Sequence, residues 1–244
     1  KNKELLILED EKIFFNFINY IKNLKKNHHA QIFQDIFASF IVQNNFKKTF
    51  LEFGATNGIN LSNTYLLEKE LGWSGILAEP DIQWHEALRK NRPKTKIITQ
   101  CIWKKSNEKL KFFSSSQGVL STIEDFKFSD KESMPDNSNN RNVSGKNIIV
   151  ETISLNDVLT KYFDGTCPSY ISIDTEGSEF EILNSFNFSK FKPAVFTVEH
   201  NFTKLEQKID ELMVKNNYSR IFRKLTSFDA WYVSNDMLHQ LNSA

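Results

Sequence analysis

At 244 residues the chain is long enough for one α/β domain with additions, and its 31 Lys and Arg against 30 Asp and Glu leave no overall basic field for nucleic acid. No apolar run approaches the ~20 residues of a membrane-spanning helix. Acids interrupt the only apolar patch of residues 1–10, so no signal peptide is recognisable, and Cys101 and Cys167 form no Cys-x-x-Cys motif. We therefore expect a cytoplasmic protein with no nucleic-acid partner, membrane span or zinc site.

Residues 1–46 predict a helical extension ahead of the main domain. Apolar side chains recur at three- and four-residue steps between Phe14 and Leu24, which is typical of a helix with one buried face. A second helix is expected over Ala30–Gln43. Docking of the apolar stripe on the domain is the favoured interpretation, although the stripe could serve a homodimer, and neighbouring lysines leave a membrane-surface helix as an alternative.

From residue 49 onward, predicted strands and helices alternate, as in a parallel sheet covered by helices on both faces. The main predicted strands are Thr49–Phe53, Gly75–Ala78, Lys96–Ile102, Ser169–Ile173 and Ala194–Val198. The predicted helices are Asn60–Leu71, Ile82–Lys90, Leu155–Tyr162, Glu179–Ser185 and Lys204–Lys215. Further extended segments are Leu110–Phe113 and Ile148–Ile153, with a closing antiparallel pair at Tyr218–Lys224 and Ala230–Ser234. The pattern delimits a domain at residues 47–236.

The stretch at about residues 114–147 breaks this alternation. It is rich in Ser, Asn, Asp and Lys, and its middle shows no hydrophobic periodicity. Long segments of this kind inside a compact domain are functional lids or surface insertions. Both interpretations stay open from the sequence.

The first strand runs into a glycine-spaced turn, Phe50–Gly58, and a helix is expected to follow. Gly54 and Gly58 would allow backbone N–H groups to approach a ligand closely. The spacing is Glu-x-Gly-x-x-x-Gly, which differs from the Gly-x-Gly-x-x-Gly of dinucleotide-binding domains. The turn therefore predicts a nucleotide-type pocket, with a purely structural turn as the alternative.

Acidic residues follow four of the predicted parallel strands. Glu79 stands about 20 residues beyond the glycine turn, where an acid commonly binds both ribose hydroxyls of an adenosine. The other acids at strand ends are Glu52, Asp174, Glu176 and Glu199. Because carboxyl ends of parallel strands meet at one edge of a sheet, these acids should surround one site. Such a site suits a cationic or hydroxyl-rich ligand better than a phosphate.

Four segments carry a more specific pattern: Phe50–Gly58, Gly75–Asp81, Ile171–Glu179 and Val198–Asn201. Together they resemble the FkbM family of S-adenosylmethionine-dependent methyltransferases, and the Ile-Asp-x-Glu-Gly-x-Glu run that begins at Ile173 is the most specific part. The resemblance implies a Rossmann-like class I methyltransferase fold with a mostly parallel seven-stranded sheet. It also implies methyl transfer to a hydroxyl oxygen of a sugar, nucleotide-sugar, glycan or related small molecule.

The resemblance implies roles for individual residues as well. Glu79 would hold the ribose, Ile102 and Trp103 would flank the adenine, and Asp174 would face the methionine amine or the acceptor. The residues implied on the methionine side are Glu52, Gly54, Asn57 and Gly58. The segment Gln100–Lys104 departs from the usual pattern because only Gln100 could contact the adenine amino group, so Ser121 of the insertion is an alternative contact.

Methyl transfer to a hydroxyl benefits from a general base, and three residues are candidates. His200 follows the fifth main strand, and a neutral imidazole accepts a proton near pH 7. Asp174 and Glu176 are the rivals, while Glu199 could orient His200 or bind a substrate hydroxyl. These four side chains could instead hold Mg²⁺ or Mn²⁺, although a divalent metal is not predicted. A nicotinamide-dependent oxidoreductase and a non-catalytic nucleotide-binding domain are the competing functions.

Overall fold

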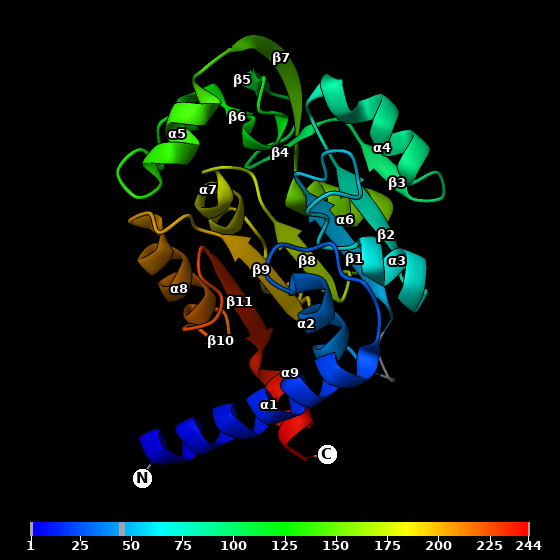
Figure 1. The fold of residues 1–244 in the computed structure, drawn as a ribbon, viewed down its shortest axis with the longest axis vertical. Helices are drawn as coiled ribbons and strands as arrows, with labels where there is room; N and C mark the ends of the chain where they lie inside the picture. Colours follow the sequence, from blue (N-terminus) through cyan, green and yellow to red (C-terminus); the bar gives the residue numbers. More distant parts are fainter. Residues whose placement is uncertain (1, 44–46, 244) are drawn as a thin grey trace.

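Two β-sheets organise the computed structural model, which describes residues 2–43 and 47–243 (Figure 1). In spatial order, the seven-stranded sheet contains β10 (Tyr218–Ile221), β11 (Asp229–Ser234), β9 (Val195–Glu199), β8 (Tyr170–Ile173), β1 (Thr49–Phe53), β2 (Ser74–Ala78) and β3 (Lys96–Ile98). Strands β9, β8, β1, β2 and β3 run parallel, while β11 is antiparallel to both β9 and β10. The mostly parallel seven-stranded sheet and its closing antiparallel pair are therefore confirmed.

Helices cover both faces of this sheet, as predicted. The described helices are α1 (Asn2–Leu24), α2 (Gln34–Ile41), α3 (Tyr65–Leu71), α4 (His85–Asn91), α5 (Pro135–Arg141), α6 (Leu155–Tyr162), α7 (Glu179–Asn184), α8 (Leu205–Lys215) and α9 (Asn235–Ser243). Side chains alternate across β1. Leu51 belongs to the core that includes α6, α7 and α8, and Phe50 to the core that includes α2, α3 and α4. This alternation places one hydrophobic core on each face.

Several predicted boundaries differ from the structure. The predicted strand Lys96–Ile102 is two strands, β3 and β4 (Cys101–Trp103), which belong to different sheets. The helix expected over Asn60–Leu71 begins only at Tyr65, because the preceding residues turn to donate hydrogen bonds to the buried Glu52 carboxylate. The predicted segment Ile82–Lys90 opens as a 3₁₀ turn, η1 (Ile82–Trp84), before α4.

A four-stranded sheet, which the sequence did not predict, stands at the end of the molecule opposite α1 and α9 (Figure 1). Its strands are, in order, β4, β7 (Gly145–Ser154), β5 (Lys109–Ser115) and β6 (Thr122–Ile123). The segment at residues 114–147 supplies the end of β5, the short helices η2 (Gly118–Leu120) and η3 (Glu124–Phe126), β6, α5 and the start of β7. The stretch without sequence periodicity is therefore folded over the carboxyl ends of the main strands.

The N-terminal extension contains α1 and α2, joined by residues without regular structure. Helix α2 begins at Gln34, four residues later than the predicted start at Ala30, and residues 44–46 of the predicted extension lie outside the described part. Ile13 and Phe17 of α1 are buried in the core that includes α2 and α9. Among the described helices, none combines the length and apolar character required to cross a membrane.

Candidate functional site

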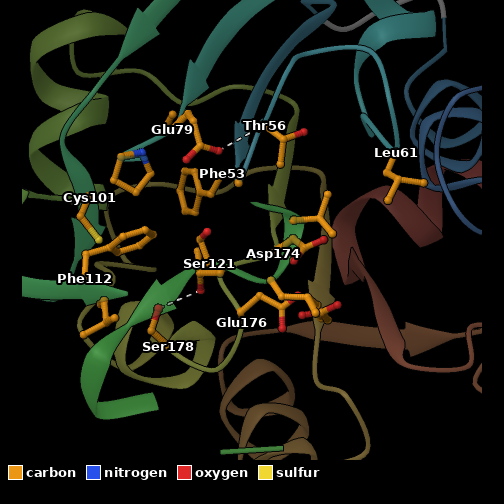
Figure 2. A pocket seen from close by; sticks show the side chains of 18 of the residues that line it. Phe53, Thr56, Leu61, Glu79, Cys101, Phe112, Ser121, Asp174, Glu176 and Ser178 are labelled. Carbon is orange, nitrogen blue, oxygen red and sulfur yellow. Dashed lines mark hydrogen bonds between the residues drawn. The ribbon is translucent and has the colours of Figure 1, made fainter. Parts of the chain in front are cut away.

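A cavity of about 360 Å³, drawn with lining side chains in Figure 2, opens where the parallel strands of the large sheet end. Residues of the small sheet and of α5 line its other side. The residues after β1, β2 and β8 and the last residue of β9 contribute to its wall. The volume lies within the ~300–1,000 Å³ of typical small-molecule sites, and ligands of open α/β sheets bind at this edge. This cavity is the candidate site.

The turn after β1 brings the cavity wall close to β8. Gly54 has a φ of 69°, which side chains of L-residues rarely adopt. A Cβ added to Gly54 would lie less than 3.0 Å from the backbone oxygen of Asp174. Only glycine therefore allows the ends of β1 and β8 to approach this closely, and the structure places Gly54 itself in the cavity wall.

Glu52, the acid of the same turn, is not among the described residues that line the cavity. Its carboxylate is buried and accepts hydrogen bonds from the Ser62 hydroxyl at 3.0 Å, from the Asn63 backbone N–H at 2.7 Å and from the Thr64 hydroxyl. Each contact shapes the chain that leads into α3. The structure thus places the Glu52 carboxylate behind the wall, in hydrogen bonds that shape the chain before α3.

Asn57 and Gly58 are also absent from the described lining. The Asn57 Oδ1 atom accepts hydrogen bonds from the backbone N–H groups of Ile59 and Asn60, both at 2.9 Å, so it closes a local turn. Gly58 has a φ of 77°, and its backbone oxygen accepts a hydrogen bond from Arg92 at 3.1 Å. Of the four residues implied on the methionine side, the structure brings only Gly54 to the cavity.

Glu79 lies at the end of β2 and lines the cavity. Its two carboxylate oxygens accept hydrogen bonds from the backbone N–H groups of Thr56 and Asp81, each at 2.8 Å, and Figure 2 shows the bond to Thr56. Burial raises the pKa of Glu79 to about 7, although these two hydrogen bonds oppose the shift. The β2 end thus presents an oriented carboxyl group to the cavity.

Asp174, Glu176 and Glu199 form an acidic cluster in the same cavity. One carboxylate oxygen from each lies within 4.8 Å of the others, so the three side chains could hold a divalent cation. Burial raises the pKa of Asp174 to about 7 and that of Glu176 to about 8, and repulsion from neighbouring acids adds to both shifts. Glu199 has a strongly raised pKa for the same reasons, and its Oε2 atom is buried without a hydrogen-bond partner among the described residues.

The loop that carries Asp174 and Glu176 is held by Glu179, the last acid of the Ile-Asp-x-Glu-Gly-x-Glu run. Its carboxylate accepts hydrogen bonds from the Thr175 backbone N–H at 2.9 Å and from the Gly177 backbone N–H at 3.0 Å. Glu176 itself has a φ of 59°, a conformation that requires such support. The run therefore combines acids that face the cavity with an acid that fixes the shape of the loop.

Arg141 is the main site residue that sequence reasoning missed. Its side chain is fully buried, and it donates two hydrogen bonds to Asp130, at 2.8 and 3.1 Å, and one to Glu176 at 2.6 Å. Its remaining N–H groups reach the backbone oxygens of Leu120 at 2.8 Å and Lys127 at 3.1 Å. No spacing motif singles out this arginine within the Asn-rich segment, so the sequence carries no signal for it.

Apolar side chains form another part of the wall. They are Phe53, Leu61, Ile102, Phe112, Val119, Leu120 and Ile123. Ile102 thus lines the cavity, whereas Trp103 is not among the described lining residues and packs against Phe126 at a ring distance of 5.9 Å. Ser121 lines the cavity and its hydroxyl accepts a hydrogen bond from the Ser115 backbone N–H at 3.0 Å, while Gln100 is not among the described residues of the wall.

His200, the first candidate for a general base, lies outside this cavity and borders a separate space of about 10 Å³. Its Nδ1 atom accepts a hydrogen bond from the Phe202 backbone N–H at 3.0 Å, and its Nε2 atom lies 3.1 Å from the Arg220 guanidinium. Burial lowers the pKa of His200, and the charge of Arg220 adds to this effect against the opposing charge of Glu206. The structure therefore brings Asp174, Glu176 and Glu199 together and leaves His200 in a different contact network.

Comparison with protein families gives a match to the methyltransferase FkbM domain over residues 52–230. The chain belongs to the FkbM methyltransferase family. The match begins at Glu52 of β1 and ends in β11. It therefore includes the small sheet and the described cavity-lining residues other than Gln31. A search of curated proteins finds no match.

Solved structures with a similar fold include the FkbM methyltransferase from Methylobacillus flagellatus KT, with a TM-score of 0.50 and 11% identity over 92% of this FkbM chain and 54% of that one. The chain thus spans about half the length of that relative. A precorrin-6y C5,15-methyltransferase from Geobacter metallireducens GS-15 has a TM-score of 0.41 and 11% identity, over 86% of this chain and 88% of that one. A ribosomal protein L11 methylase from Lactobacillus delbrueckii subsp. bulgaricus has a TM-score of 0.39 and 9% identity, over 82% of this chain and 74% of that one.

Proposed function

We propose that the cavity binds S-adenosylmethionine and that the domain transfers its methyl group to a hydroxyl oxygen of a sugar, glycan or related small molecule. The observation that carries the proposal is the placement of Glu79 and the Asp174, Glu176 and Glu199 cluster around one cavity at the strand ends. Carboxylates at this edge suit the ammonium and sulfonium charges of the cofactor and the hydroxyl groups of both ligands. Membership of the FkbM family supports the same assignment.

The residues present fit this cofactor. Each oxygen of Glu79 accepts one backbone N–H, and an ionised carboxylate has further lone pairs that can accept the ribose hydroxyls. Gly54 keeps the β1 turn free of a side chain where the cofactor would meet backbone atoms. Ile102, Phe112 and Ile123 offer an apolar surface to the adenine ring.

Bound S-adenosylmethionine would supply an activated methyl group on its sulfonium, so the difficult chemistry belongs to the cofactor. The protein must orient the acceptor hydroxyl, exclude water and remove a proton. Orientation can contribute ~7–11 kcal/mol, whereas a general base contributes ~10²–10⁴-fold in rate. The walls of the cavity therefore matter at least as much as the identity of the base.

Asp174 and Glu176 are the residues that we propose for proton removal. Both line the cavity, and both have a pKa raised to between about 7 and about 8 by burial and by neighbouring acids. A carboxylate with such a pKa is a stronger base than an exposed one and is still ionised in part near neutral pH. Glu199 would bind a substrate hydroxyl beside them, as its unpartnered oxygen allows.

Calorimetric titration with S-adenosylhomocysteine tests the cofactor site. We expect the wild-type domain to bind and Glu79→Ala to weaken binding at least about tenfold, since two ribose hydroxyls lose a charged acceptor. Glu86→Ala is the matched control, because Glu86 is an exposed acid of α4 nearby in the chain. Equal binding by Glu79→Ala and wild type, or thermal stabilisation by NADH in place of S-adenosylhomocysteine, would contradict the proposal.

A further inference from the structure

The ionisable side chains that line the cavity in the described part of the chain are acids, apart from the Cys101 thiol. No Lys, Arg or His stands among those lining residues. Burial raises the pKa of Cys101 to about 12, so this thiol stays neutral. Whether protonated or ionised, these carboxyl groups supply no positive charge, and a bound S-adenosylmethionine adds a single net one. An anionic acceptor would therefore find no cation on the cavity wall to compensate its charge.

Arg141 does not change this conclusion, although it contacts Glu176. A guanidinium has five N–H donors, and all five are used in the bonds to Asp130, Glu176, Leu120 and Lys127. Its charge is shared by two carboxylates with exposed fractions of 2% and 9%. Arg141 thus holds the protein together at this point and has no donor left for a phosphate.

Helix α5 presents a different chemistry to the same cavity. Asn137 and Asn140 are three residues apart, so their side chains share one face of the helix, and both line the cavity. Gln117 lines it from the segment just before η2. Their side-chain amides make no hydrogen bond within the described chain. An amide both donates and accepts, which suits the hydroxyl groups of a neutral ligand.

We propose that Gln117, Asn137 and Asn140 form the acceptor-recognition face of the site and select an uncharged, polyhydroxylated acceptor over a phosphate-bearing one. This inference rests on the proposed methyl transfer. Of the acceptors that the sequence leaves open, it retains the sugar or glycan and excludes the nucleotide-sugar, whose diphosphate adjoins the sugar ring. The folded insertion is then the element that determines acceptor specificity.

The first test compares acceptors in matched sets. The neutral acceptors are methyl glycosides of hexoses, 6-deoxyhexoses and N-acetylhexosamines. Their anionic partners are the 6-phosphates of the hexoses and N-acetylhexosamines and the nucleotide diphosphate esters of all three classes. Each is incubated with the FkbM chain and S-adenosylmethionine, and the release of S-adenosylhomocysteine is measured. We expect kcat/KM for the neutral member to exceed that of its anionic partner at least about tenfold. Faster turnover of an anionic member overturns the inference. So does failure of every neutral member when the cofactor binds, whereas failure of the cofactor to bind overturns the proposed function itself.

The second test uses variants of α5 with the best neutral acceptor. Asn137→Ala with Asn140→Ala should raise the acceptor KM about tenfold, because two hydrogen bonds to the ligand are lost, and should leave the Kd of S-adenosylhomocysteine unchanged. Asn139→Ala is the matched control, since Asn139 is exposed on the same helix and does not line the cavity. Equal KM values for the double variant and the control would show that α5 does not read the acceptor.

Discussion

Replacement of Gly54 by alanine tests the close approach of β1 and β8 that positions Asp174. Gly54 and Gly72 have nearly the same backbone conformation, with φ of 69° and 71°. Their surroundings differ, because a Cβ at Gly54 would lie less than 3.0 Å from the Asp174 backbone oxygen, whereas a Cβ at Gly72 has nothing within 4 Å. The pair therefore separates the cost of the conformation from the cost of the contact.

The expected losses follow from these two terms. Any L-residue at either position adopts the left-handed region, which costs about 1–2 kcal/mol of unfolding free energy. At Gly54 the added methyl also displaces backbone atoms of the neighbouring strand end, and such overpacking costs about 1–3 kcal/mol more. Gly72→Ala should thus lose about 1–2 kcal/mol and Gly54→Ala about 2–5 kcal/mol.

Urea unfolding at equilibrium measures both losses, provided that the unfolding free energy falls with urea concentration at the same slope in both variants and the wild type. Calorimetry with S-adenosylhomocysteine supplies a second measurement: Gly54→Ala should weaken binding because it displaces Asp174, and Gly72→Ala should not. Equal unfolding free energies for the two variants would refute the contact between the β1 turn and Asp174. Equal affinities would refute its role in the site.

Arg141→Gln should lower the unfolding free energy by about 3–5 kcal/mol, because it leaves Asp130 and Glu176 buried without their cation. Arg223→Gln, at a side chain that is 57% exposed, should lower it by at most about 1 kcal/mol. Urea unfolding compares the two variants, and equal losses would contradict the buried ion pair. Burial raises the pKa of Glu79 from 4.5 to about 7, so this group ionises at a lower pH in the unfolded chain than in the folded one. The unfolding free energy should therefore fall by about 3 kcal/mol between pH 4.5 and 7 on account of Glu79. An equally steep dependence of the unfolding free energy on pH in Glu79→Gln would contradict this. His200→Gln should change kcat little and Asp174→Asn should lower it ~10²-fold or more, and the reverse order would restore His200 as the base.

The sequence predicted the features that depend on local pattern. Alternating strands and helices gave the large sheet, and acids at strand ends gave Glu79, Asp174, Glu176 and Glu199 at one cavity. Both follow from the geometry of parallel sheets, in which carboxyl ends share an edge. The hydrogen bonds of Glu52 could not be predicted, because its three donors lie in a loop where the sequence predicted a helix.

Features that depend on distant contacts could not be predicted. Arg141 binds Asp130 and Glu176 from 11 and 35 residues away, and nothing in the local pattern records either contact. In the small sheet, β4 pairs with β7, which lies beyond most of the insertion in the sequence. The division of the predicted strand Lys96–Ile102 between two sheets therefore has no local signal either. The direction of the His200 ring depends on Arg220, which lies 20 residues further along the chain.

The buried ion pair between Arg141 and Glu176 links the two halves of the site. The large sheet supplies Gly54, Glu79 and the acidic cluster, while the insertion supplies the amides of α5 and the arginine directly after Asn140. Because Arg141 lowers the pKa of Glu176 against the effect of burial, the fold of the insertion affects the charge of a carboxylate proposed for proton removal. A change of acceptor specificity within α5 that disturbed Arg141 would therefore also change the chemistry. Specificity can vary at Asn137 and Asn140 only as long as the neighbouring arginine keeps its place.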